Sequence, residues 1–261
     1  MKFCTLFSGS SGNCIFVEYA STRILIDAGK NVKTIRTALR GIGYDLSDID
    51  AVILTHGHSD HVSAVRVLAS RWSMPVMGTF GTLERLLDTC EDLMPGRLTM
   101  IDDNAVYEIG DLSVTVFKTP HDIEGSVGFS VLAGDRRLTV ATDIGYVTPE
   151  IYSLMQRSDF IIIESNYDNY MLENGPYPPS LVQRIKSRLG HLSNADCAET
   201  VSRLVKDGVR HFMLAHLSVN NNTVELAMGA TLGRLIDEGV KPGEVTVDIA
   251  PRDEAGKVFV L

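Results

Sequence analysis

Three histidines and an aspartate lie within six residues, in the sequence Thr55-His56-Gly57-His58-Ser59-Asp60-His61. Imidazole and carboxylate side chains bind zinc, manganese or iron in proteins. Such a dense group of them favours a metal site over a polar surface turn, and a catalytic metal ion keeps one coordination position open for water. The segment therefore predicts metal-dependent chemistry.

An apolar segment precedes these residues and an amphipathic segment follows them. Residues 51–54 are Ala-Val-Ile-Leu, the pattern of a buried strand. Apolar side chains then recur three or four residues apart, as in a helix, at Val62, Val65, Leu68 and Trp72. Ser59 is suited to cap this helix, which would place Asp60 and His61 in its first turn. We therefore predict two groups of ligands, with the two earlier histidines on one metal ion and Asp60 and His61 on a second.

The composition is that of a folded chain with a sizeable core. The sequence has 261 residues, of which 44% are hydrophobic, and we predict a single domain over residues 1–261. Its formal net charge of −9 weighs against a basic nucleic-acid groove. Two bound divalent cations would nevertheless concentrate positive charge at the site, so the overall charge is weak evidence about substrate.

The cysteines and apolar segments bear on the location of the protein. The four cysteines are far apart in the sequence, and their spacing is not that of metal ligands: they are Cys4, Cys14, Cys90 and Cys197. The N-terminal segment before Ser8 is too short for a signal peptide, and no run of about 18 apolar residues could cross a membrane. We therefore predict a cytoplasmic protein that does not associate with membranes.

Further candidate ligands follow the predicted strands along the chain. Each comes shortly after an apolar or alternating segment: Asp27, His121, Asp143, Glu164 and His216. Asp27 could orient a ligand histidine or cap a loop, and both roles stay open. His191 precedes a helix predicted over residues 195–206. His211, beside Arg210, is predicted to be structural or solvated.

The segment 55–61 resembles the His-x-His-x-Asp-His signature of the metallo-β-lactamase superfamily. Two runs of strands interleaved with helices, over residues 1–54 and 106–215, resemble the αββα four-layer sandwich of that superfamily, which is an α/β (α+β) fold. The resemblance covers almost the whole chain. Ala141-Thr142-Asp143 also resembles a Gly-Asp-Thr-like motif of the superfamily, with alanine in place of glycine.

The resemblance implies a site with two divalent metal ions, either zinc or manganese, with iron as a further alternative. His121 stands where the superfamily carries the third histidine of its first metal site. The implied ligands are His56, His58 and His121 for the first ion, Asp60, His61 and His216 for the second, and Asp143 for both. Such a pair of ions activates a water molecule for hydrolysis.

Several short motifs resemble the WalJ/YycJ-like subgroup of this superfamily. They are Ser8–Cys14, Leu25–Gly29, Glu164–Asn166, Gly190–Asn194 and His216–Ser218 with Asn220–Asn222. The subgroup implies phosphodiester hydrolysis, most specifically a 5′-to-3′ exonuclease acting on DNA. Tyr167 departs from the pattern, because members of the subgroup often carry histidine there.

The same resemblance suggests residues for catalysis and substrate contact. The spacing from His191 to His216 is similar to that in tRNase Z. His191 is therefore a candidate donor of the leaving-group proton, with Glu164 holding its ring. The candidate catalytic residues are His191, Asp60 and Glu164. The candidate substrate-binding residues are Ser10, Ser11, Asn13, His191, Ser218 and Asn221.

Other functions stay open. The same metal site would serve a small-molecule hydrolase such as a cyclic phosphodiesterase, thioesterase or lactonase. A metal-bound scaffold without activity is disfavoured, because every ligand position is filled. The segment between Asp143 and His216 is too short for the extra domain of β-CASP nucleases.

A basic stretch with Arg184, Lys186 and Arg188 is either a solvated helix face or a contact for a phosphate backbone. The oligomeric state is left open.

Overall fold

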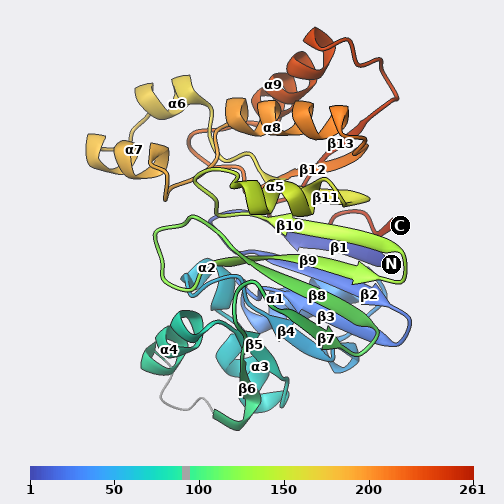
Figure 1. Ribbon diagram of the computed structural model, residues 1–261. Helices are drawn as coiled ribbons and strands as arrows, with labels where there is room; N and C mark the ends of the chain where they lie inside the picture. The colour runs from blue at the N-terminus through green and yellow to red at the C-terminus, as the bar shows by residue number, and fades with distance from the viewer. Residues whose placement is uncertain (90–94) are drawn as a thin grey trace. The chain divides into compact units, whose positions relative to one another are not determined.

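The computed structural model describes residues 1–89 and 95–261. Its strands form two seven-stranded β-sheets with helices beside them, which agrees with the predicted sandwich of helices and sheets (Figure 1). The chain divides into two compact units. The first contains residues 1–118, 123–135 and 251–261, and the second contains residues 119–122 and 136–250. The existence of one domain over the whole chain stays a prediction.

The first unit contains one complete sheet, in the strand order β14-β1-β2-β3-β4-β5-β6. Its strands are β1 (Lys2–Phe7), β2 (Cys14–Tyr19), β3 (Thr22–Ile26), β4 (Ala51–Ile53), β5 (Val76–Gly78), β6 (Leu98–Met100) and β14 (Phe259–Val260). The pairs from β3 to β6 are parallel, and β3 and β4 are almost entirely buried, as parallel strands covered on both faces should be. The unit also holds the antiparallel strands β7 (Val106–Ile109), β8 (Leu112–Lys118) and β9 (Val127–Ala133).

Helices of the first unit pack on this sheet through a large apolar core. They are α1 (Val32–Gly41), α2 (Ser59–Val62), α3 (Val65–Arg71) and α4 (Phe80–Thr89), with short 3-10 turns at Leu46–Asp48 and Pro95–Arg97. Buried Leu39, Val52, Leu54 and Leu68 belong to one cluster. Leu54 is the last apolar residue before the histidine-rich segment, so the core fixes the point where that segment begins.

The predicted helix after residue 59 is interrupted, and its predicted cap is wrong. His58, not Ser59, takes the cap position, and the helix is divided into α2 and α3. The Asp60 carbonyl accepts a hydrogen bond from the backbone N–H of Asn13 at 2.8 Å, and the N–H of Ala64 donates to the Ala28 carbonyl at 2.9 Å. These long-range bonds replace the helical one that would join Asp60 to Ala64.

The second unit is built on four parallel strands in the order β10-β11-β12-β13. They are β10 (Arg136–Ala141), β11 (Phe160–Glu164), β12 (His211–Ala215) and β13 (Thr246–Ile249). The helices are α5 (Pro149–Met155), α6 (Asn169–Asn174), α7 (Pro179–Lys186), α8 (Asn194–Lys206) and α9 (Val224–Asp237). Helices α8 and α9 pack together (Figure 1). Parallel strands end at one edge of a sheet, so residues after β10, β11 and β12 converge.

Two further observations concern the location predictions. None of the described helices has the length and apolar character needed to cross a membrane. Cys4, Cys14 and Cys197 are buried free thiols, whereas Cys90 lies outside the described residues.

Candidate metal centre

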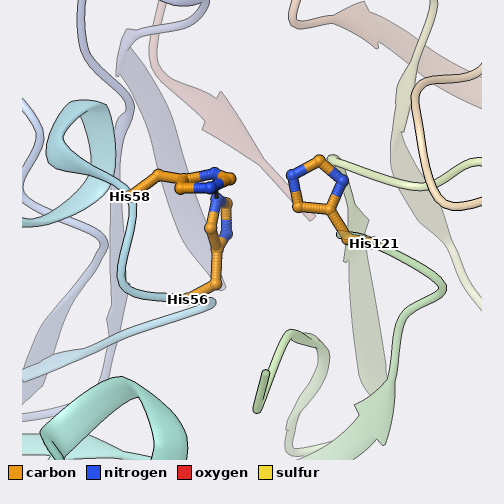
Figure 2. Close-up of side chains that lie close together, drawn as sticks. All are labelled: His56, His58 and His121. Carbon is orange, nitrogen blue, oxygen red and sulfur yellow. Dashed lines mark hydrogen bonds between the residues drawn. The ribbon is translucent and has the colours of Figure 1, made fainter. Parts of the chain in front are cut away.

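The loop after β4 brings two imidazoles together. The Nε2 atom of His56 lies 3.0 Å from the Nδ1 atom of His58, and their rings meet edge to face at an interplanar angle of 84° (Figure 2). Two nitrogen ligands of a tetrahedral zinc ion, with bonds of about 2.0–2.1 Å, are separated by roughly 3.3 Å. The separation is compatible with two ligands of one ion, and the binding of one ion by both histidines stays a prediction.

Asp27 contacts this loop through His61 and Thr55. Its Oδ2 atom lies 2.8 Å from the Nδ1 atom of His61 and accepts a 2.8 Å hydrogen bond from the hydroxyl of Thr55. Because a carboxylate only accepts, Nδ1 of His61 carries the proton and Nε2 carries the lone pair. The Thr55 hydroxyl lies 3.1 Å from Nδ1 of His56 and orients that ring in the same way. Asp27 fills both predicted roles, because its Oδ2 atom orients His61 and its Oδ1 atom accepts a 2.8 Å hydrogen bond from the backbone N–H of Thr55.

Asn13 and Gly29 fix the backbone that carries Asp60 and His61. The Asn13 amide nitrogen lies 2.9 Å from Nε2 of His61 and 3.4 Å from Oδ2 of Asp60. A Cβ atom on Gly29 would lie only 1.6 Å from the carbonyl oxygen of Asp60. Only glycine allows this approach, which explains the position of Gly29 after Asp27-Ala28.

Replacing Gly29 by alanine should displace the predicted ligands Asp60 and His61. The added methyl group must displace the backbone at Asp60, so we expect weaker metal binding, a strong loss of activity and a destabilisation of roughly 1–3 kcal/mol. Gly41→Ala is the matched control, because a Cβ atom there meets nothing within 4 Å. Metal analysis and thermal unfolding of both variants check this result. A Gly29→Ala protein with parental metal content and Tm would contradict it.

In the second unit, four predicted residues converge at the carboxyl edge of the parallel strands. They are Asp143, Glu164, His191 and His216, whose possible ligand atoms all lie within 4.8 Å of one another. The Oδ1 atom of Asp143 lies 3.5 Å from Nδ1 of His216 and 3.8 Å from Nδ1 of His191. The sheet register explains the convergence, because Ile163 pairs with both Ala141 and Leu214.

Glu164 lies at the centre of this group and is fully buried. Its Oε1 atom lies 2.8 Å from Nδ1 of His216 and 2.9 Å from Nδ1 of His191. Its Oε2 atom accepts hydrogen bonds from the backbone N–H groups of Ile144 at 2.9 Å and Leu192 at 3.0 Å. Glu164 therefore positions two histidines and the loop after Asp143, and these contacts give it a supporting role.

The ionisation of this group follows from its contacts. Burial opposes the charged form of Glu164, but His191 and His216 outweigh it and hold the pKa of this carboxyl well below its usual range. Burial likewise opposes protonation of His191, but the negative charges of Glu164 and Asp143 raise its pKa above the ordinary value. Glu164 and His191 thus each favour the charged form of the other.

His121 follows β8 and belongs to the second unit. Its Nδ1 atom lies 3.1 Å from the Gly190 carbonyl oxygen, and its Nε2 atom lies 3.9 Å from Oδ1 of Asp143. Figure 2 shows its side chain. His61, His121 and His216 each have Nδ1 on a buried oxygen acceptor, an arrangement typical of histidines that bind metal through Nε2. The donor set thus fits divalent metal ions.

Strained backbone occurs at three of these positions. Asp27, Asp143 and His216 have φ angles of +62°, +54° and +56°, in the left-handed region that non-glycine residues rarely adopt. Each stands just after a strand, at Ile26, Ala141 and Ala215. Such strain concentrates at functional sites, because the surrounding structure must hold the residue in place.

The predicted substrate-binding residues have different surroundings. Ser10 and Ser11 are exposed, and the Ser11 hydroxyl accepts from Lys30 at 2.9 Å and donates to Asp253 at 3.2 Å. Asn13 is buried beside Asp60 and His61. Ser218 lies on the loop after β12, where its hydroxyl accepts from the backbone N–H of Asn221 at 3.2 Å; Asn221 itself is buried. Substrate contact by these residues stays a prediction.

A buried amide network behind β12 was not predicted. Asn194 Oδ1 accepts hydrogen bonds from Ser165 at 2.7 Å and from Asn222 at 2.9 Å. Asn166 donates to the His216 carbonyl at 2.8 Å. The network ties the strained residue His216 to the start of α8. Its only signal in the sequence is the frequency of asparagine in the motifs at 166, 194 and 220–222.

The fold and the site together define a class of protein. Residues 22–217 match the model of the beta-lactamase superfamily domain, and the chain belongs to the metallo-β-lactamase superfamily. Exodeoxyribonuclease YycJ of Bacillus anthracis is 30% identical over 94% of this chain and 92% of that protein. Exodeoxyribonuclease WalJ of Streptococcus pneumoniae is 32% identical over 96% of this chain and 94% of that protein. The metallo-beta-lactamase fold protein YhfI of Bacillus subtilis shares the fold, with a TM-score of 0.74 at 17% identity over 99% of this chain and 98% of that one.

Proposed function

We propose that this chain is a metal-dependent phosphodiester hydrolase, and specifically a 5′-to-3′ exonuclease acting on DNA. The observation that carries the proposal is its similarity to two exodeoxyribonucleases over more than nine tenths of the chain. The clustered imidazoles and carboxylates supply the metal chemistry that such hydrolysis uses. The same similarity favours DNA over the small-molecule substrates that the sequence left open.

We assign the ligands in two groups, with zinc or manganese as the metals and iron as a further alternative. The first ion takes His56, His58 and His121, the second takes Asp60, His61 and His216, and Asp143 binds both. Bound there, two dications would lower the pKa of a shared water and neutralise charge on a phosphate oxygen. Asp27 and Glu164 keep the ligand rings in the required orientation, as their 2.8 Å contacts with His61 and His216 indicate.

We further assign to His191 the proton that the leaving oxygen requires. The seven ligand positions are filled without it, and its side chain is 22% exposed, compared with 4% for His216 and 2% for His121. Glu164 holds Nδ1 of its ring at 2.9 Å, so Nε2 is the nitrogen that can face a substrate. His191 would thus donate a proton from a fixed ring while the ligand side chains take no part in proton transfer.

An activity panel tests the proposed function. The purified protein should degrade end-labelled DNA with added zinc or manganese and lose this activity after chelation, and RNA and a cyclic phosphodiester should be poorer substrates. Faster turnover of thioesters, lactones or cyclic diesters than of DNA would contradict the proposal. We also propose that the chain forms a single domain and that the protein acts in the cytoplasm.

A further inference from the structure

We propose that Arg188 binds a phosphate of the DNA strand that flanks the scissile linkage, and that Tyr146 holds its guanidinium in place. The Cζ atom of Arg188 lies 4.1 Å from the centroid of the Tyr146 ring. This inference rests on the proposed function, because it names a contact for the same substrate.

The backbone around Arg188 lies against the loop after Asp143 and the side chain of His121, both of which belong to the proposed metal centre. A Cβ atom on Gly145 would lie 2.2 Å from the Arg188 carbonyl oxygen, so the two backbones touch, and Gly145 comes two residues after Asp143. Two residues beyond Arg188, the Gly190 carbonyl contacts His121 at 3.1 Å. The short segment from Arg188 to Gly190 is therefore fixed at both ends, by Gly145 at one end and by His121 at the other.

Arg188 also differs from its basic neighbours in its ion pairing. Arg184 pairs with Asp122 and Lys186 pairs with Glu173, so those cations are already neutralised by carboxylates. Within the described part of the chain, no carboxylate forms an ion pair with Arg188, and its side chain is exposed. The basic stretch predicted from the sequence thus reduces to one cation that is suited to bind an anion.

Stacking on tyrosine prepares a guanidinium for phosphate. A guanidinium that contacts an aromatic ring through one face keeps its N–H groups available, and these can donate two parallel hydrogen bonds to phosphate oxygens. Because Tyr146 already restricts the side chain, less conformational entropy is lost when DNA binds. A lysine could not reproduce this planar arrangement.

The test compares oligonucleotides that carry one uncharged methylphosphonate linkage at successive positions from the 5′ end. For the parent enzyme, one position near the cleaved linkage should raise KM about tenfold, which is the size of a lost charged hydrogen bond. Arg188→Ala should raise KM by a similar factor on unmodified DNA and should show no additional loss at that position. Arg188→Lys should rescue it incompletely, Tyr146→Leu should resemble Arg188→Ala, and Lys186→Ala should retain the parental pattern.

The outcomes separate the phosphate contact from a structural role and from the proposed function. If Arg188→Ala slows bis-p-nitrophenyl phosphate as much as DNA, or lowers metal content, the stack only fastens the loop after Asp143 and the inference is wrong. Equal sensitivity of the parent and Arg188→Ala to every methylphosphonate would also overturn it. If the parent cuts no DNA at all, the proposed function fails, and the phosphate contact fails with it.

Discussion

Replacing Asp143 by alanine should abolish hydrolysis and reduce the bound metal from about two ions per chain to one or none. Asp143 is 2% exposed, has a strained φ angle of +54° and lies 3.5 Å from His216 and 3.9 Å from His121. A carboxylate in that position can bind both ions of the proposed centre. Its loss would leave mutually repelling cations without their shared ligand.

Metal analysis by mass spectrometry and hydrolysis assays check this result together. Asp88→Ala, which removes an exposed aspartate of α4, is the control and should keep both metal and activity. Full metal occupancy in Asp143→Ala would rule out the bridging assignment, even if activity were lost.

Replacing His191 by alanine should slow DNA hydrolysis by about 10²–10⁴, the usual cost of removing a general acid. The loss should be much smaller on bis-p-nitrophenyl phosphate, because nitrophenolate leaves without a proton. The contact of His191 with Glu164 and its greater exposure than His121 and His216 are the reasons for this assignment.

His211→Ala is the matched control, since His211 is exposed at the start of β12. Metal content must be measured on the same samples. A drop in metal would make His191 a ligand, and equal slowing of both substrates with metal intact would make it a phosphate-positioning residue. Only a selective loss on DNA agrees with proton donation.

The sequence predicted the parts of the site that depend on strand ends. Asp143, Glu164 and His216 each follow an apolar strand, and parallel strands bring such ends to one edge. The start of α8 was also predictable, because the Ser193 hydroxyl accepts from the N–H of Asp196, an ordinary local cap. These features depend on short-range patterns that a sequence displays directly.

Other features depended on contacts between distant residues and could not be predicted. The division of the helix after His58 is caused by hydrogen bonds from Asn13 and to Ala28, which are more than 30 residues away in the chain. Likewise, Arg184 and Lys186 are neutralised by carboxylates of other segments, Asp122 and Glu173. Charge patterns along the sequence could not distinguish Arg188 from these two.

The most direct test of the proposed activity is the release of label from single-stranded DNA by the purified protein. The oligonucleotide carries a label at the 5′ end or at the 3′ end, and the reaction contains zinc or manganese, with chelated and Asp143→Ala samples alongside. The proposed function predicts immediate release of single labelled nucleotides from the 5′-labelled strand, progressively shortened products from the 3′-labelled strand, and no reaction in either control. Cleavage from the 3′ end, internal cuts alone, or activity that survives in the Asp143→Ala sample would contradict it.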